Sequence, residues 1–284
     1  MQKPGHVGRI ALIWLLLSTV GMVLVATVLA PHLPPGSSST EASGQRFDNE
    51  VLTLISVPIV VLVLGYLGYV LFVFRERDPS AAADGPPIRG HMRVQTTWVL
   101  LTSVTALAMA AFGTYELLGG SGGGQGPHPV FVPSAQFTAA GAKDPPLQVQ
   151  VIAQQWQFTY RYPDNGGFET AHLVLPVDRQ VELHVTSLDA IHSFWATALG
   201  VKADANPGVD NIAYVTPKRV RSFAVHCAEL CGLFHGYMFD TGQVMSAAGF
   251  TAWVTEQRAF MAPVAKYLPA YGGKYLPEPT VRGG

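Results

Sequence analysis

Charged residues are scarce in this chain. They make up 13% of its 284 residues, about half of their share in a typical soluble domain. The formal net charge of −1 argues against a nucleic-acid-binding protein that relies on a basic surface. Cysteine is also rare, and two residues cannot form a disulfide scaffold. Intrinsic disorder is excluded for most of the chain because 49% of its residues are hydrophobic and can be buried.

The few charged residues are unevenly distributed, and three stretches contain none: Ile10–Ala30, Val51–Phe74 and Thr96–Tyr115. Each is close to the roughly 20 residues that a helix needs to cross a bilayer. We therefore expect residues 51–116 to form two transmembrane helices joined by a loop at 75–95. Residues 1–30 have the basic start, apolar middle and small-residue end of a signal peptide. They are either a signal peptide or a first membrane helix.

The positions of the arginines predict the orientation of these helices. The loop between the last two helices contains Arg75, Arg77, Arg89 and Arg93, whereas the segment 31–50, which we expect to be a loop, contains only Arg46. Arginine and lysine accumulate in cytoplasmic loops, so the arginine-rich loop is expected in the cytoplasm. The chain after Tyr115 then lies on the outer, periplasm-equivalent side of the cell membrane, as part of a multi-pass protein.

The composition changes after the last apolar run. Residues 119–127 read GGSGGGQGP, which is typical of a flexible linker, and we place the linker at 117–145. Short β-rich runs follow, separated by turn residues: Leu147–Ile152, His172–Leu175, Val181–Thr186 and Val220–Val225. This spacing predicts an all-β sandwich or barrel over residues 146–262. One helix is expected at Ala247–Ala259 with Ser246 as its N-cap, followed by a surface tail at 263–284.

Both cysteines lie in one short segment, which reads HCAELCGLFHGYM from His226 to Met238. A disulfide is one interpretation in an oxidising compartment, but it leaves His235 and Met238 unexplained. Thiolate, imidazole and thioether donors together suit copper, and a zinc site would not need the methionine. Two thiolates on one loop favour two metal ions bridged by both sulfur atoms.

Such a two-metal centre needs a further histidine from elsewhere in the chain. His192, at the end of a strand pattern, is the best candidate. His172 and His184 lie in alternating segments and are interpreted as surface or cup-lining residues. The side chain of His226 should point away from that of its neighbour Cys227, so we interpret it as structural.

The signature Cys-x-Glu-x-Cys-x-x-x-His-x-x-Met at 227–238 resembles the dinuclear copper A (CuA) loop of cytochrome c oxidase subunit II. The resemblance extends to Asp189–Trp195, Lys202–Gly208 and the aromatic stretch Gln155–Tyr160, and covers roughly residues 50–260. It implies a membrane α-helical hairpin, with a possible third N-terminal helix, followed by an all-β cupredoxin-like Greek-key domain.

The resemblance also implies roles for individual residues. Cys227 and Cys231 would bridge two copper ions, with His192 and His235 as terminal ligands. The weak ligands would be the Met238 thioether and the Glu229 carbonyl oxygen. The Glu229 carboxylate would also reach a magnesium ion shared with subunit I, near Asp204, since carboxylates suit hard cations.

The function implied by the resemblance is electron transfer within a respiratory cytochrome c oxidase. Trp156 would receive electrons from cytochrome c or a complex-bound cytochrome. Haem in subunit I would then take them for reduction of oxygen to water, with subunit III as a further partner. No Cys-x-x-Cys-His motif occurs, so this chain carries no c-type haem. A quinol oxidase subunit would lack the copper ligands. The alternatives are a nitric oxide reductase subunit and a membrane-anchored copper protein without a partner enzyme.

Two positions depart from the family pattern. Arg161 stands beside the aromatic stretch, where family members often have an acidic residue, so a strongly acidic docking face is not evident. Many family members also have Glu-x-x-Trp at the start of the helix that leads to the outer domain. This chain has Gln95 and Trp98 in that frame. A glutamine side chain does not titrate in the physiological range, so we expect proton uptake near this point not to use the side chain of residue 95.

Overall fold

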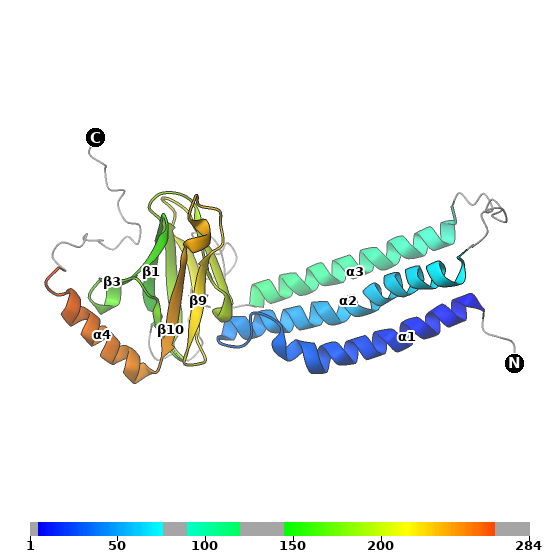
Figure 1. Ribbon diagram of the computed structural model, residues 1–284, viewed down its shortest axis with the longest axis horizontal. Coiled ribbons are helices and arrows are strands. Elements are labelled where there is room, and N and C mark those ends of the chain that lie inside the picture. Colours follow the sequence, from blue (N-terminus) through cyan, green and yellow to red (C-terminus); the bar gives the residue numbers. More distant parts are fainter. Residues whose placement is uncertain (1–4, 76–89, 120–144, 265–284) are drawn as a thin grey trace. The chain divides into compact units, whose positions relative to one another are not determined.

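The computed structural model describes residues 5–75, 90–119 and 145–264. The chain divides into two compact units, and the second is not contiguous in sequence. A helical unit contains Met1–His32 and Asp48–Gly119, and a β unit contains Leu33–Phe47 and Gly120–Gly284 (Figure 1). The predicted loop at 75–95, linker at 117–145 and tail at 263–284 lie largely outside the described residues and stay predictions, except that residues 92–95 and 117–119 belong to the helix Met92–Gly119.

The helical unit contains α1 (His6–Leu24), α3 (Met92–Gly119) and most of α2 (Thr40–Val73), whose first eight residues belong to the β unit. Alpha-helical α1 continues as a π-helical turn at Val25–Leu29 and a 3-10 turn at Ala30–His32. The segments His6–His32, Thr40–Val73 and Met92–Glu116 are each long and apolar enough to cross a membrane. The first and third segments contain the uncharged runs Ile10–Ala30 and Thr96–Tyr115, and the second contains the run Val51–Phe74 except for Phe74.

Helices α1 and α2 pack closely within this unit. The indole Nε1 of Trp14 donates a hydrogen bond to the carbonyl oxygen of Pro58, at 2.8 Å. A Cβ atom on Gly21 would come within 2.8 Å of Val57 Cγ1, so glycine is needed for this close approach. Near one end of the pair, His6 Nδ1 lies 2.8 Å from the Tyr69 hydroxyl.

The segment 31–50 is not the continuous loop that we predicted, because α2 already begins at Thr40. The physical reason is a local cap. The Ser39 hydroxyl accepts a hydrogen bond from the backbone N–H of Ala42, at 2.9 Å, which satisfies one of the unpaired donors of the first helical turn. Glu41 in that turn also interacts favourably with the helix dipole.

The β unit consists of two five-stranded sheets, with strand orders β3-β2-β1-β5-β8 and β4-β10-β9-β6-β7. Strand β1 pairs in parallel with β5, and β4 in parallel with β10, whereas the other pairs are antiparallel. The elements are β1 (Leu147–Gln154), β2 (Gln157–Tyr162), β3 (Phe168–Thr170), β4 (Val174–Pro176), β5 (Val181–Ser187), β6 (His192–Ala196), β7 (Val201–Ala205), β8 (Asn211–Val215), β9 (Arg221–Cys227), β10 (Phe239–Met245) and α4 (Ala247–Met261).

The four predicted β runs coincide with β1, β4, β5 and β9, within two residues at each boundary. The other six strands lie outside them. His192 begins β6 rather than ending a strand, and His172 precedes β4. Helix α4 is capped as predicted, since the Ser246 hydroxyl accepts from the Gly249 N–H at 3.1 Å.

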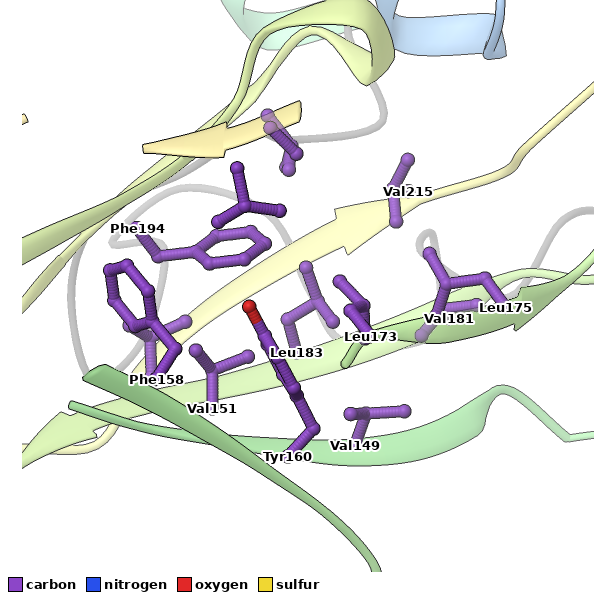
Figure 2. Packing of buried hydrophobic residues seen from close by; sticks show 14 of the residues in the cluster. Val149, Val151, Phe158, Tyr160, Leu173, Leu175, Val181, Leu183, Phe194 and Val215 are labelled. Atoms are coloured by element: carbon purple, nitrogen blue, oxygen red, sulfur yellow. The ribbon is translucent and has the colours of Figure 1, made fainter. Parts of the chain in front are cut away.

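The core lies between the inward faces of the two sheets, and Figure 2 shows a part of it. Val151 and Leu183 come from one sheet and Phe194 from the other, and all three are fully buried. The rings of Phe158 and Phe194 meet edge to face, with centroids 5.9 Å apart. Phe194 follows His192 by two residues, so this packing also fixes the strand that carries the predicted metal ligand.

The segment Leu33–Phe47 is part of the β unit because its residues bond to the turn between β6 and β7 and to the end of β8. The Ser39 hydroxyl donates to the Leu199 carbonyl oxygen at 2.6 Å. The Glu41 carboxylate accepts from the Thr216 N–H at 2.9 Å. A Cβ atom on Gly200 would lie 2.7 Å from the Ala42 Cα, so only glycine permits this contact.

Candidate metal centre

The predicted metal donors come from two places in the second sheet. His192 is the first residue of β6, and the other donors lie on the loop between β9 and β10. Two backbone hydrogen bonds close this loop against the sheet. The Cys227 N–H donates to the Met238 carbonyl at 3.0 Å, and the Ala228 N–H donates to the Ser193 carbonyl at 2.9 Å. Gly232, within the loop, has a φ of 115°, which favours glycine.

The structure brings all six predicted donors together. The Sγ atoms of Cys227 and Cys231 are 3.7 Å apart, and both thiols are free. A disulfide would need about 2.05 Å, so the structure does not support the disulfide interpretation. His192 Nδ1 lies 3.8 Å from Cys227 Sγ and 3.1 Å from Met238 Sδ. His235 Nδ1 lies 3.6 Å from Cys231 Sγ, and the Glu229 carbonyl oxygen lies 3.3 Å from Cys227 Sγ.

The members of this donor group differ in how far they are buried. His192 is fully buried, and both thiols and the Met238 thioether are almost so. His235 is half-buried, whereas the Glu229 side chain is exposed. Burial, reinforced by the neighbouring Cys227, raises the pKa of the Cys231 thiol to about 12. Because thiols coordinate metals in the deprotonated form, metal binding here must release protons.

The chemistry of this donor set fits copper. Two sulfur atoms, a thioether and two imidazoles are soft donors of the kind that copper prefers. His192, Cys227 and Cys231 form a group whose ligand atoms all lie within 4.8 Å of one another. The site is thus compact enough to hold a metal without rearrangement of the sheet.

Trp156 and its neighbour Gln155 contact the same loop. The indole Nε1 of Trp156 and the side-chain amide of Gln155 both donate to the carbonyl oxygen of Cys231, at 3.2 and 2.9 Å. The Trp156 ring meets Phe234 edge to face at a centroid distance of 4.9 Å. Trp156 is half-buried and is therefore both connected to the donor group and accessible from outside.

Asp204 lies beside the site rather than in it. Its carboxylate accepts a hydrogen bond from the hydroxyl of Ser193, the neighbour of His192, at 2.8 Å. Glu229 contributes its backbone carbonyl to the donor group, and its side chain is exposed. The magnesium assignment of these two carboxylates therefore stays a prediction.

The other histidines differ in exposure and in their neighbours, more than the sequence predicted. His226 is exposed while Cys227 is buried, so the predicted opposition of their side chains is confirmed. The side chain of His172 is largely exposed and contacts Asp240. His184 is not a surface residue, because it is 4% exposed and lies between the carboxylates of Asp210 and Glu182.

One residue that contacts the site was not among the predicted site residues. The carboxylate of Asp189 lies 2.9 Å from Nε2 of His192. Burial raises the pKa of this carboxyl, but hydrogen bonds from the Gln155 N–H and the His192 side chain outweigh that effect and lower the pKa overall. The signals in the sequence were its place three residues before a predicted ligand and at the start of the stretch Asp189–Trp195, which carries the resemblance.

A two-sheet β unit with cysteine, histidine and methionine donors at one end of its strands is a cupredoxin-like domain. Residues 168–241 match the family described as "Cytochrome C oxidase subunit II, periplasmic domain". The resemblance of this chain to cytochrome c oxidase subunit II is thereby confirmed, as is the predicted fold class of apolar helices followed by such a domain.

Relatives extend the similarity to most of the chain. Cytochrome c oxidase subunit 2 of Thermostichus vulcanus is 29% identical over 310 aligned residues, covering 94% of this chain and 91% of the relative. The Bacillus subtilis protein of the same name is 27% identical, covering 95% of this chain and 72% of the relative. Among solved structures, the periplasmic domain of subunit II of cytochrome oxidase from Bradyrhizobium japonicum is 32% identical. That alignment covers 40% of this chain and 94% of that domain, with a TM-score of 0.39.

Proposed function

We propose that this chain is the electron-transfer subunit of a respiratory haem–copper oxidase. It would accept electrons from a cytochrome and pass them to haem in a partner subunit that reduces oxygen to water. The observation that carries the proposal is the convergence of six soft or weak donors in one buried site, within a domain of the subunit II family. A pair of copper ions bound there would supply one-electron transfer.

The residues of the site have distinct tasks in this proposal. The thiolates of Cys227 and Cys231 and the imidazoles of His192 and His235 would hold the copper ions. The Met238 thioether and the Glu229 carbonyl are weaker donors, which tune the reduction potential more than they hold the metal. The two thiols and the Met238 thioether are almost fully buried, so water has little access to the sulfur donors.

Copper stoichiometry and spectra of the full-length chain in detergent test this assignment. The parent should bind two copper ions per chain. Cys227→Ser and Cys231→Ser should each abolish the paired centre, whereas Met238→Leu should shift the reduction potential with little loss of copper. His226→Asn is the matched control, because this histidine neighbours Cys227 but points away from the site. One copper ion per parent chain, or a Cys227–Cys231 disulfide in the active complex, would refute the proposal.

We assign the reception of electrons to Trp156. Its hydrogen bond to the Cys231 carbonyl connects an accessible aromatic ring to the backbone of a cysteine that would hold copper. In the assembled complex, Trp156→Ala should slow oxidation of the donor cytochrome while copper content stays unchanged. Trp253→Phe is the control, since Trp253 packs against Tyr162 and Phe168 away from the donors. Parent rates in Trp156→Ala would rule this role out.

The donor is either soluble cytochrome c or a cytochrome bound within the complex. A soluble basic donor steered by charge would react more slowly as salt is added. We expect weak salt dependence, because Glu229 and Asp189 are the only charged residues within the segments 188–195 and 226–238. A steep loss of rate between low and physiological salt would instead favour electrostatic steering.

The partners of the chain are a haem-bearing subunit I and a subunit III in the same membrane, with the arginine-rich loop in the cytoplasm. Glu229 and Asp204 would lie at the contact with subunit I, where the Glu229 carboxylate would reach a magnesium ion near Asp204. Purification of the complex tests both statements. A haem protein should co-purify, and Glu229→Ala should lose magnesium. Reduction of nitric oxide without reduction of oxygen, or copper binding without any haem partner, would overturn the assignment to an oxidase.

Proton uptake should not depend on Gln95, which lies in the first turn of α3. Turnover of the assembled complex with Gln95→Ala should equal that of the parent at each pH. Loss of most of the activity, with copper and haem retained, would show that this position belongs to the proton path.

A further inference from the structure

We propose that Asp189 is a positioning residue that fixes the ring of His192 and ties it to the segment that carries Trp156. The inference rests on the proposed copper function for its consequence, but the hydrogen bonds that support it belong to the protein alone. Asp189 would neither bind metal nor transfer electrons itself. Its task is to decide which ring nitrogen of His192 faces the sulfur atoms.

The two ring nitrogens of His192 have different surroundings. Nδ1 faces Met238 Sδ at 3.1 Å and Cys227 Sγ at 3.8 Å. Nε2 faces Asp189 Oδ1 at 2.9 Å. An ionised carboxylate can only accept hydrogen bonds, so the shared proton belongs to Nε2. The lone pair of a neutral imidazole is then on Nδ1. This is the nitrogen that faces the sulfur donors and would bind the metal.

The Asp189 carboxylate is itself held from several sides. Its Oδ2 accepts from the Gln155 backbone N–H at 2.8 Å, and its Oδ1 accepts from the Ala190 N–H at 2.6 Å. The Asp189 N–H donates to the hydroxyl of Ser187, the last residue of β5, at 3.2 Å. These bonds set the orientation of the carboxylate before any metal is present. Because the carboxylate is already oriented, the His192 ring that it binds needs little rearrangement when metal binds.

Gln155 connects this arrangement to the other side of the site. Its backbone N–H binds Asp189, and its side chain joins Trp156 on the Cys231 carbonyl. The turn between β1 and β2 therefore contacts one histidine ligand through Asp189 and the backbone carbonyl of one cysteine ligand directly. A shift of His192 would therefore displace Trp156, and a shift of Trp156 would displace His192.

Asp189→Asn is the informative substitution because it preserves shape and changes only hydrogen-bonding capacity. The carboxylate accepts from His192 on one oxygen and from Gln155 on the other, whereas an amide has one oxygen and one NH₂ group. The variant must therefore lose one of these two bonds. Removal of such a partner of a metal-binding histidine typically costs about 10–100-fold in metal affinity.

The experiment measures Cu(I) affinity of the full-length chain in detergent, by competition with a chromophoric chelator. We expect Asp189→Asn to bind copper about 10–100-fold more weakly, with an altered copper spectrum and reduction potential. Asp178→Asn is the matched control, since that exposed carboxylate pairs with Lys218 away from the donors, and it should match the parent. Parent-like affinity, spectrum and potential in Asp189→Asn would overturn the proposal.

A measurement on the metal-free parent keeps the test decisive if the variant fails to fold. Nitrogen-15 NMR of the histidine-labelled chain should show His192 protonated on Nε2. A proton on Nδ1 in the parent would overturn the positioning role. This NMR signal does not depend on copper. Failure of the parent to bind two copper ions would refute the proposed function, whereas the protonated nitrogen of His192 would still test the role of Asp189.

Discussion

A buried imidazole on β5 makes the stability of the β unit depend on pH. His184 is 4% exposed, with Nδ1 2.7 Å from Asp210 Oδ2 and Nε2 3.3 Å from Glu182 Oε1. Gln148 Oε1 also faces Nε2 at 2.7 Å. Burial lowers the pKa of His184, but the hydrogen bonds and negative charges of Asp210 and Glu182 outweigh it and raise the pKa from 6.5 to about 9.

The sign of the effect follows from the direction of this pKa change. A group whose pKa is higher in the folded state stabilises that state fully below its unfolded pKa, here about 6.5. The contribution is lost as the pH rises through about 9. The difference between the two pKa values corresponds to about 3 kcal/mol of unfolding free energy. We therefore expect the β unit to lose up to about that amount between pH 6.5 and 9.5.

Denaturant unfolding of the full-length chain in detergent, followed by near-ultraviolet circular dichroism, measures this loss. His184→Gln should be less stable at pH 6.5 and should show a much smaller decrease toward pH 9.5. Asp178→Asn is the control, because its surface ion pair with Lys218 is worth at most about 1 kcal/mol and its removal should leave the pH dependence intact. Equal pH dependence in His184→Gln and the parent would refute the reasoning.

Three further predictions concern the segment Leu33–Phe47, helix α4 and the thiols. Gly200→Ala should destabilise the β unit by about 1–3 kcal/mol, since the new Cβ would meet the Ala42 backbone at a φ of +64°; unfolding curves of the variant check this. Ser246→Ala should remove the α4 cap at a cost of about 1 kcal/mol, and an unchanged unfolding midpoint would contradict it. Because the pKa of Cys231 is raised, copper affinity should increase with pH and copper uptake should acidify a weakly buffered solution; a pH-independent affinity would be inconsistent with protonated thiols.

The metal donors could be predicted from the sequence because five of them lie within twelve residues of one loop. Their spacing is a local property of the sequence and is recognised without knowledge of the fold. The three apolar helices were predictable for a similar reason, since the absence of charge over about 20 residues is itself the physical requirement for crossing a bilayer. Helix α4 was predictable from its cap, Ser246.

Contacts between distant segments could not be predicted in this way. The Cys231 carbonyl accepts from Trp156, 75 residues earlier in the chain, and only the register of the sheets brings them together. Strands such as β6 and β7 are five residues long, too short to show a clear pattern. His184 alternates with apolar residues as an exposed strand residue would, but Asp210 and Glu182 replace the water that we expected around it.

The discontinuous β unit has a consequence for the order of events during synthesis. Ser39 and Glu41 leave the ribosome 160 and 175 residues before their partners Leu199 and Thr216. At about 5–20 residues per second, this delay lasts roughly 10 to 30 seconds. Helices α2 and α3 are completed within that interval. The bonds of Leu33–Phe47 to the β strands are therefore among the last to form, and a nascent chain arrested before residue 199 would still lack them.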